Sequence, residues 1–210
     1  MSKRVTENTL SKVNKLLGIE ESYKAPERIM ELISNEETAK KLFLNALVEF
    51  DYDLSYEWFT SYFEDEHADR KNKKQDFTPT CLSRLMSEMI SSDKSQGIIY
   101  EPAAGSGSTI ISHWQSETRK FRFPWDYNPA DYLYVCSELS DKVVPFLIFN
   151  LLIRGINAAV IHGNTLTKEC KEVYACINES NDYMSFSRLV KLPHNKDVEE
   201  IFDVNFKEAE

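Results

Sequence analysis

Long apolar runs and a surplus of basic residues are both lacking in this 210-residue chain. No stretch approaches the ~20 consecutive apolar residues that cross a bilayer, and the opening MSKRVTENTLSKVNKLLGIE has no apolar core of the kind that secretory signals need. We therefore expect a soluble protein of the cytoplasm. The formal net charge of −9 disfavours a protein that binds nucleic acid tightly by itself, because neutralising phosphates takes concentrated lysine and arginine.

Cysteine and histidine are also scarce. The four cysteines and four histidines stand at Cys81, Cys136, Cys170, Cys176, His67, His113, His162 and His194. No subset has the spacing of a zinc ligand set or of a disulfide framework. The nucleophile elbow G-x-S-x-G and the phosphate loop G-x-x-x-x-G-K-S/T are missing as well. We expect reduced, packed cysteines and no bound metal.

The first 75 residues carry a helical pattern. Apolar residues recur there at spacings of three and four, as in Leu10, Val13, Leu16 and Leu17, which predicts a small helical N-terminal domain over residues 1–75. A charged run, EDEHADRKNKKQD, then marks the boundary. Its basic half, Arg70 to Lys74, could contact phosphate or form a solvated linker.

A second domain is predicted over residues 76–210, where short apolar runs alternate with helices. The runs are IIY at 98–100, YLYVCSEL at 132–139, AAVIHG at 158–163 and VYACI at 173–177. This alternation predicts an α/β fold with a mostly parallel sheet covered on both faces. Ligands of such sheets lie beyond the carboxyl ends of the strands.

Three successive strands end in groups suited to a nucleoside. With only six glycines in the chain, two stand in the small-residue turn EPAAGSGS, where Gly105 and Gly107 let a ligand approach the backbone. Glu138 could accept hydrogen bonds from a ribose diol, or act as an acidic residue at the start of a helix. Asn164 could pair with an adenine edge, or close an ordinary Asx turn.

These motifs together resemble the S-adenosylmethionine-dependent adenine-N6 DNA methylases related to the modification subunits of type I restriction systems. EPAAGSG is similar to that family's D-P-A-C-G-S-G loop, F-T-P at 77–79 to its upstream cofactor segment, ELSD to its acidic second strand tip, and GNTL to its G-D-x-L. The resemblance implies a Rossmann-like methyltransferase fold and S-adenosylmethionine as the cofactor. Other stretches, such as DLSYEWFTSYF, resemble small methylase-like proteins of bacteriophages and prophages.

The resemblance also assigns site residues. Phe77, Thr78 and Pro79 would lie along the methionine part of the cofactor, and Gly105 and Gly107 would approach it by their backbone. Glu138 would hold the ribose and Asn164 would face the adenine. The implied cofactor-binding set is Phe77, Thr78, Pro79, Glu101, Ala103, Gly105, Gly107, Glu138 and Asn164.

Two departures from the family pattern bear on activity. The N-P-P-Y/F motif that should follow the fourth strand is missing, and only Asn178 stands in its register as a candidate catalytic acceptor. About thirty residues separate Gly105 from Glu138, against the ~20 of a compact unit. The excess, residues 116–131, is basic and aromatic, and could stack on a DNA base or a protein partner, or pack as a surface flap.

Two functions follow as hypotheses. The first is an S-adenosylmethionine-binding protein, phage-borne by resemblance, that methylates DNA adenine only with a partner such as a specificity subunit. The second is an inactive protein of the same fold that binds a host protein, such as a restriction or other defence complex.

Overall fold

The computed structural model describes residues 9–60, 62–63, 78, 81–83, 85–86 and 97–207. Two predicted cofactor residues, Phe77 and Pro79, and the basic run Arg70 to Lys74 lie outside these ranges.

The N-terminal region is helical, as its apolar spacing predicts. It contains α1 (Thr9–Leu17), a short 3-10 turn (Ser22–Lys24), α2 (Ala25–Ile33) and α3 (Glu36–Glu49). Helix α3 begins where it does because the Asn35 side chain accepts hydrogen bonds from the backbone N–H groups of Glu37 and Thr38.

These helices share one hydrophobic core with the rest of the chain. Phe43 of α3 packs edge-on against Phe149, with ring centroids 5.3 Å apart, and Phe59 packs against Phe146 at 4.9 Å. Both partners belong to α7 (Val144–Ile153), in which all ten residues are buried. The helical region and the sheet region are therefore packed together through α7; the domain division at residue 75 stays a prediction.

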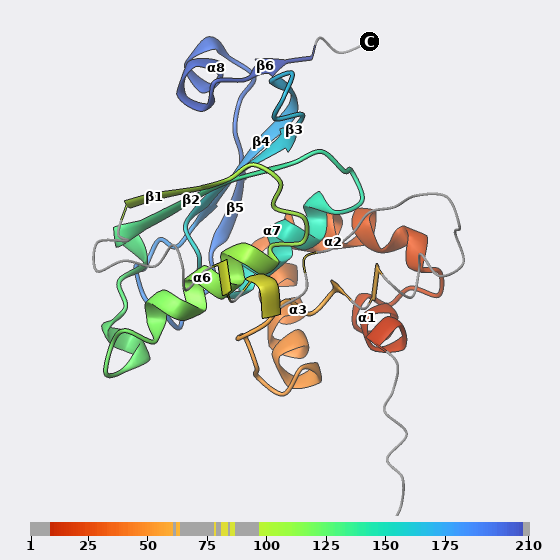
Figure 1. Ribbon diagram of the computed structural model, residues 1–210. Helices are drawn as coiled ribbons and strands as arrows, with labels where there is room; N and C mark the ends of the chain where they lie inside the picture. Colours follow the sequence, from red (N-terminus) through yellow and green to blue (C-terminus); the bar gives the residue numbers. More distant parts are fainter. Residues whose placement is uncertain are drawn as a thin grey trace, which may run out of the picture.

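The sheet confirms the predicted α/β class. Its strands are β1 (Gly97–Glu101), β2 (Tyr132–Glu138), β3 (Ala158–Gly163), β4 (Glu169–Ile177), β5 (Arg188–Lys191) and β6 (Asn205–Phe206). Their order is β1-β2-β3-β4-β5, with β6 paired to β4 (Figure 1). β1, β2 and β3 are mutually parallel, which gives the Rossmann-like part of the fold.

Strand β4 differs from the expected topology. The run VYACI does form a strand, but it joins β3 as an antiparallel hairpin partner, and β5 then pairs antiparallel with β4. A five-residue connection between β3 and β4 is too short for the crossover that a parallel strand requires, and this explains the reversal. Consequently the carboxyl end of β4 lies at the opposite edge of the sheet from the carboxyl ends of β1, β2 and β3.

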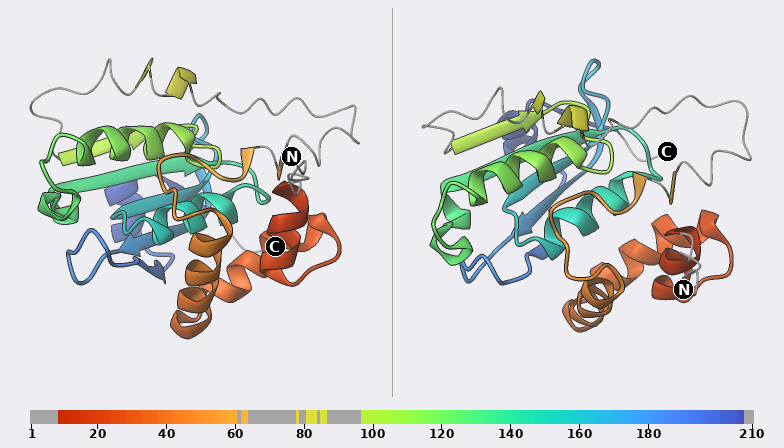
Figure 2. Two further views of the ribbon diagram at one scale, coloured as in Figure 1. Left: turned by 90° about the horizontal axis from the view of Figure 1, so that it is seen from below. Right: turned by 60° about the horizontal axis from the view of Figure 1, so that its bottom comes forward.

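The helices cover the two faces unequally. Helices α6 (Ser108–Thr118) and α7 lie on one face, and α8 (Lys196–Phe202) covers β3 and β4 on the other, where Val198 joins a small core with Ile161 and Val173 (Figure 2). On that second face of β1, Ile98 is 74% exposed and Tyr100 is 55% exposed. Within the described residues, coverage of both faces is thus limited to the β3 and β4 side.

Candidate functional site

The small-residue loop after β1 has the backbone conformation that its glycines predict. Gly105 has φ of 56° and Gly107 has φ of 101°, a region that residues with a Cβ rarely adopt. A Cβ on Gly107 would also lie 3.1 Å from Cδ1 of Leu147 on α7. The chain thereby turns from β1 into α6 over six residues, 102–107.

Glu101 fixes the beginning and the end of this loop. Its Oε1 accepts a hydrogen bond from the N–H of Ala103 (3.2 Å), and its Oε2 accepts one from Oγ1 of Thr109 in the first turn of α6 (2.9 Å). Ala103 itself is exposed, whereas the N–H of Ala104 donates to the carbonyl oxygen of Ser137 (2.9 Å) and so ties the loop to β2.

Glu138 joins the first strand tip to the second. Its Oε2 accepts a hydrogen bond from the N–H of Gly105 (3.0 Å), and its Oε1 accepts one from the N–H of Ser140 (2.8 Å). The side chain is half-buried. Each carboxylate oxygen has a second lone pair, so the carboxylate can still accept hydrogen bonds from a ligand.

Asn164 lies at the third tip and forms the Asx turn that was the alternative interpretation. Its Oδ1 accepts hydrogen bonds from the N–H groups of Leu166 (2.9 Å) and Thr167 (3.3 Å). The neighbouring Thr165 donates through Oγ1 to the carbonyl oxygen of Pro102 (2.7 Å), which ties the third tip to the first loop.

The structure therefore brings the three predicted tips to one edge of the sheet, and we call Gly105, Glu138 and Asn164 with their loops the strand-tip site. The hydroxyl of Ser106 in this site is buried and has no hydrogen-bond partner in the described part of the chain. Thr78 is half-buried, and Phe77 and Pro79 lie outside the described residues.

Asn178 does not belong to the strand-tip site. Because β4 runs antiparallel to β3, Asn178 follows the end of β4 at the opposite edge, where its Nδ2 donates to the carbonyl oxygens of Gly155 (3.0 Å) and Asp182 (2.8 Å). Its side chain is buried and closes a loop. The register that made Asn178 a candidate catalytic acceptor therefore does not bring it to the strand-tip site.

The inserted residues 116–131 connect the end of α6 to the start of β2, and so they also lie at the opposite edge. Part of the segment is packed, since Tyr127 stacks on Tyr132 and the carbonyl oxygen of Pro129 accepts a hydrogen bond from Asn157. Phe123 and Trp125 remain 41% and 66% exposed and stack on each other with centroids 4.9 Å apart. The segment is both a packed flap and an exposed aromatic surface.

A buried polar cluster behind the strand-tip site was not predicted. Asn150 of α7 donates through Nδ2 to the carbonyl oxygen of Ser106 (2.8 Å) and to Oε1 of Glu57 (2.9 Å). Arg154, 2% exposed, donates through Nη1 to Oδ1 of Asn150 (2.9 Å). The single polar residue inside the apolar run VPFLIFNLLI is a sequence signal that could have identified Asn150.

Burial shifts the ionisation of this cluster. It raises the pKa of the Glu57 carboxyl, although hydrogen bonds from Thr60, Phe59 and Asn150 oppose the shift. It lowers the pKa of Arg154 to about 10, so the guanidinium is still protonated at neutral pH.

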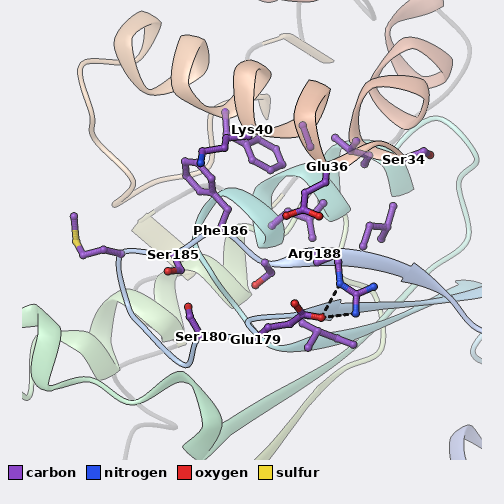
Figure 3. A pocket seen from close by; sticks show the side chains of 16 residues that line it. Ser34, Glu36, Lys40, Glu179, Ser180, Ser185, Phe186 and Arg188 are labelled. Atoms are coloured by element: carbon purple, nitrogen blue, oxygen red, sulfur yellow. Dashed lines mark hydrogen bonds and ion pairs between the residues drawn. The ribbon is translucent and has the colours of Figure 1, made fainter.

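A pocket of about 630 Å³ lies elsewhere, between the N-terminal helices and the β4–β5 connection (Figure 3). Phe43, Leu152 and Phe186 are among its apolar lining residues, and Glu179 pairs with Arg188 at its wall. None of the residues of the strand-tip site lines this pocket.

Two classes of feature are absent from the part of the chain that the structure describes. No group of three or more histidine, cysteine or acidic side chains is arranged to hold a metal ion. None of the helices described there has the length and apolar character needed to cross a membrane.

Comparisons with known proteins identify a family and a similar solved structure. The model of the N-6 DNA Methylase family matches residues 52–203. The methyltransferase subunit of a type I restriction-modification system from Streptococcus thermophilus resembles this chain at 18% sequence identity and a TM-score of 0.39. The similarity covers 74% of this chain and 35% of that subunit, so the chain spans well under half of the subunit's length. No curated protein matches.

Proposed function

Because the chain belongs to the N-6 DNA methylase family, we propose that it binds S-adenosylmethionine at the strand-tip site and takes part in DNA adenine methylation together with a partner. One observation carries the proposal: the hydrogen bond from the N–H of Gly105 to Oε2 of Glu138, which holds the small-residue loop against the acidic tip of β2. A loop for close backbone approach and a diol acceptor are thus adjacent.

The residues present fit this cofactor. Gly105 and Gly107 have no side chain to stand between a ligand and the loop, and the buried hydroxyl of Ser106 has no hydrogen-bond partner among the described residues. Glu138 keeps lone pairs for the two ribose hydroxyls. Asn164 uses its Oδ1 in the Asx turn, which leaves the amide N–H groups to donate to an adenine ring nitrogen.

Catalysis in this site would consist mainly of alignment. Bound S-adenosylmethionine supplies an electrophilic methyl group on a sulfonium. The side chains named above bind and orient, so their contribution is to hold the reacting groups in line and keep them close. The methionine part of the cofactor is proposed to lie along Phe77, Thr78 and Pro79. The conformation of the loop is proposed to depend on Glu101 and Ala103.

Transfer to DNA is proposed to require a second polypeptide. Asn178, the residue considered as the acceptor for the adenine amine, lies at the opposite edge of the sheet from the strand-tip site. A partner such as a specificity subunit would supply target recognition. We propose additional DNA contacts through Arg70 to Lys74 and through the exposed aromatic pair of residues 116–131. We propose the cytoplasm of a bacterial cell as the location of the protein.

The position of Asn178 at the opposite edge of the sheet also favours a second function. Its amide is fully used in closing a loop, so the chain could have retained cofactor binding while losing transfer. In that case the protein would act by binding a host protein, such as a restriction or other defence complex, as its resemblance to phage-borne proteins suggests.

Isothermal titration calorimetry with S-adenosylmethionine tests the shared part of both functions. We expect the wild-type protein to bind S-adenosylmethionine. Glu138→Ala should bind it about tenfold more weakly or worse, because the hydrogen bonds from the ribose hydroxyls to a charged carboxylate are removed. The matched control is Glu179→Ala, which removes a carboxylate at the opposite edge and should leave the affinity unchanged. Equal affinity of wild type and Glu138→Ala would contradict the placement of the site.

Transfer of a labelled methyl group to unmethylated DNA separates the two functions. Transfer that appears only after adding a bacterial extract supports a partner-dependent methyltransferase. Cofactor binding without transfer under either condition supports the interaction protein.

A further inference from the structure

Helix α7 presents one face both to the strand-tip site and to the segment that follows the N-terminal helices. Leu147, Asn150 and Arg154 are spaced by three and four residues, so they lie on one side of the helix. Leu147 packs against Gly107: a Cβ placed on Gly107 would lie only 3.1 Å from Cδ1 of Leu147. Arg154, about two turns after Leu147 and at the C-cap of the helix, donates to the carbonyl oxygen of Leu54 in the segment 54–60.

Asn150 links these two regions directly. Its side chain is fully buried and is the only polar one in the described helix. One Nδ2 hydrogen goes to the carbonyl oxygen of Ser106, and the other goes to Oε1 of Glu57. Burying an amide is unfavourable unless such bonds are made, so the residue is retained at a position where leucine would otherwise suit the core.

The segment 54–60 is in turn fixed to α7. Glu57 accepts hydrogen bonds from the N–H of Phe59 (2.8 Å) and from the N–H and Oγ1 of Thr60 (2.6 Å each). Arg154 donates to the carbonyl oxygens of Leu54 (3.0 Å) and Tyr56 (2.6 Å). Glu57 and Arg154 together therefore bind segment 54–60 to the polar face of α7.

We infer that Asn150 is a positioning residue for the cofactor loop, and that Glu57 holds Asn150 so that segment 54–60 sets the conformation of the Ser106–Gly107 peptide. This inference rests on the proposed function. Gly105 and Gly107 stand on either side of Ser106 with positive φ, and glycine has a wide choice of backbone conformations. The N–H of the Ser106–Gly107 peptide donates to the carbonyl oxygen of Ala104 (2.9 Å) within the loop, and the bond from Asn150 to the carbonyl oxygen of Ser106 adds a restraint from outside the loop. The hydrogen bond from Asn150 fixes the direction of the Ser106 carbonyl group. It thereby keeps the loop in the conformation in which the N–H of Gly105 donates to Glu138.

Loss of this bond should lower the population of the competent loop rather than remove a ligand contact. Apparent affinity falls in proportion to that population. The expected weakening for one buried neutral hydrogen bond is about three- to tenfold. Because the N-terminal segment supplies Glu57, anything that displaces segment 54–60 should weaken cofactor binding in the same way.

The test compares Asn150→Leu with the control Asn157→Leu. Asn157 likewise links two segments, at the opposite edge of the sheet: its Nδ2 donates to the carbonyl oxygen of Pro129, and its Oδ1 accepts from the N–H of Asn178. Two readouts are measured on each protein: affinity for S-adenosylmethionine by calorimetry, and hydrogen exchange of the Gly105 and Gly107 amides without ligand. These amides are bonded to Glu138 and Ala104, so their protection reports the loop directly.

We expect Asn150→Leu to weaken the affinity about three- to tenfold and to accelerate exchange at Gly105 and Gly107, while Asn157→Leu changes neither. Wild-type exchange rates at both glycines in Asn150→Leu would overturn the inference, as would equal acceleration in Asn157→Leu. If Asn150→Leu does not fold, Asn150→Ser, whose hydroxyl is too short to reach both acceptors, is measured in its place. If the wild type binds no cofactor, the proposed function fails, and exchange still decides the positioning role.

Discussion

Replacing Arg154 by methionine is the perturbation whose magnitude the structure defines best. The guanidinium is 2% exposed and donates four hydrogen bonds, to the carbonyl oxygens of Leu54, Tyr56 and Asn150 and to Oδ1 of Asn150. Arg154→Met keeps a side chain of similar length and leaves those buried acceptors without a donor. A buried polar group left without its partner costs about 1–3 kcal/mol, so the loss of these bonds together should lower the free energy of unfolding by about 3–5 kcal/mol.

A loss of that size is measurable by calorimetric melting. For a chain of this length each kcal/mol lowers the melting temperature by about 2–4 °C, so Arg154→Met should melt about 6–20 °C below the wild type. The control Arg188→Met removes an exposed guanidinium paired with Glu179 and should cost less than about 1 kcal/mol. A melting temperature for Arg154→Met within the range of the control would refute the reasoning that the buried hydrogen bonds of Arg154 hold the cluster together.

Three further outcomes are expected. Gly107→Val should be destabilised by about 1–3 kcal/mol in urea unfolding, because φ of 101° strains a residue with a branched Cβ, and wild-type stability would contradict the loop conformation. Burial raises the folded-state pKa of Glu57 above 4.5, so its stabilising contribution is complete below 4.5 and is lost as pH rises through the folded pKa. The free energy of unfolding of the wild type should therefore fall relative to that of Glu57→Gln as pH rises from 4.5. A difference between the two proteins that stays constant as pH rises would contradict the raised pKa of Glu57. Trp125→Ala should change the free energy of unfolding by less than about 0.5 kcal/mol, since the ring is 66% exposed, while lowering retention on DNA-cellulose if the loop contacts DNA.

The sequence predicted the fold class and the positions of the three strand tips, but not the direction of every strand. The strand tips at Gly105, Glu138 and Asn164 could be identified because each depends on local chemistry: glycines for positive φ, an acidic residue at a strand end, and an Asx-forming amide. Their hydrogen bonds to one another then follow from the parallel order of three consecutive strands.

The placement of Asn178 could not be predicted in the same way. The run VYACI has the composition of a strand in either direction, and its direction depends on the short connection from Gly163 to Glu169, where Gly163 approaches the backbone of Glu169 closely. Motif register alone placed Asn178 next to the site. The contact of Glu57 with Asn150 could not be predicted either, because the two residues are 93 positions apart and meet only through the packing of α7.

Titration of isotope-labelled protein with S-adenosylmethionine, followed by amide chemical shifts, tests the central claim most directly. We predict that the amides of Gly105, Ser106, Gly107, Leu139 and Thr165 shift together with one dissociation constant, while those of Lys40 and Arg188 at the separate pocket do not. Shifts confined to that pocket, or none at millimolar cofactor, would contradict the account.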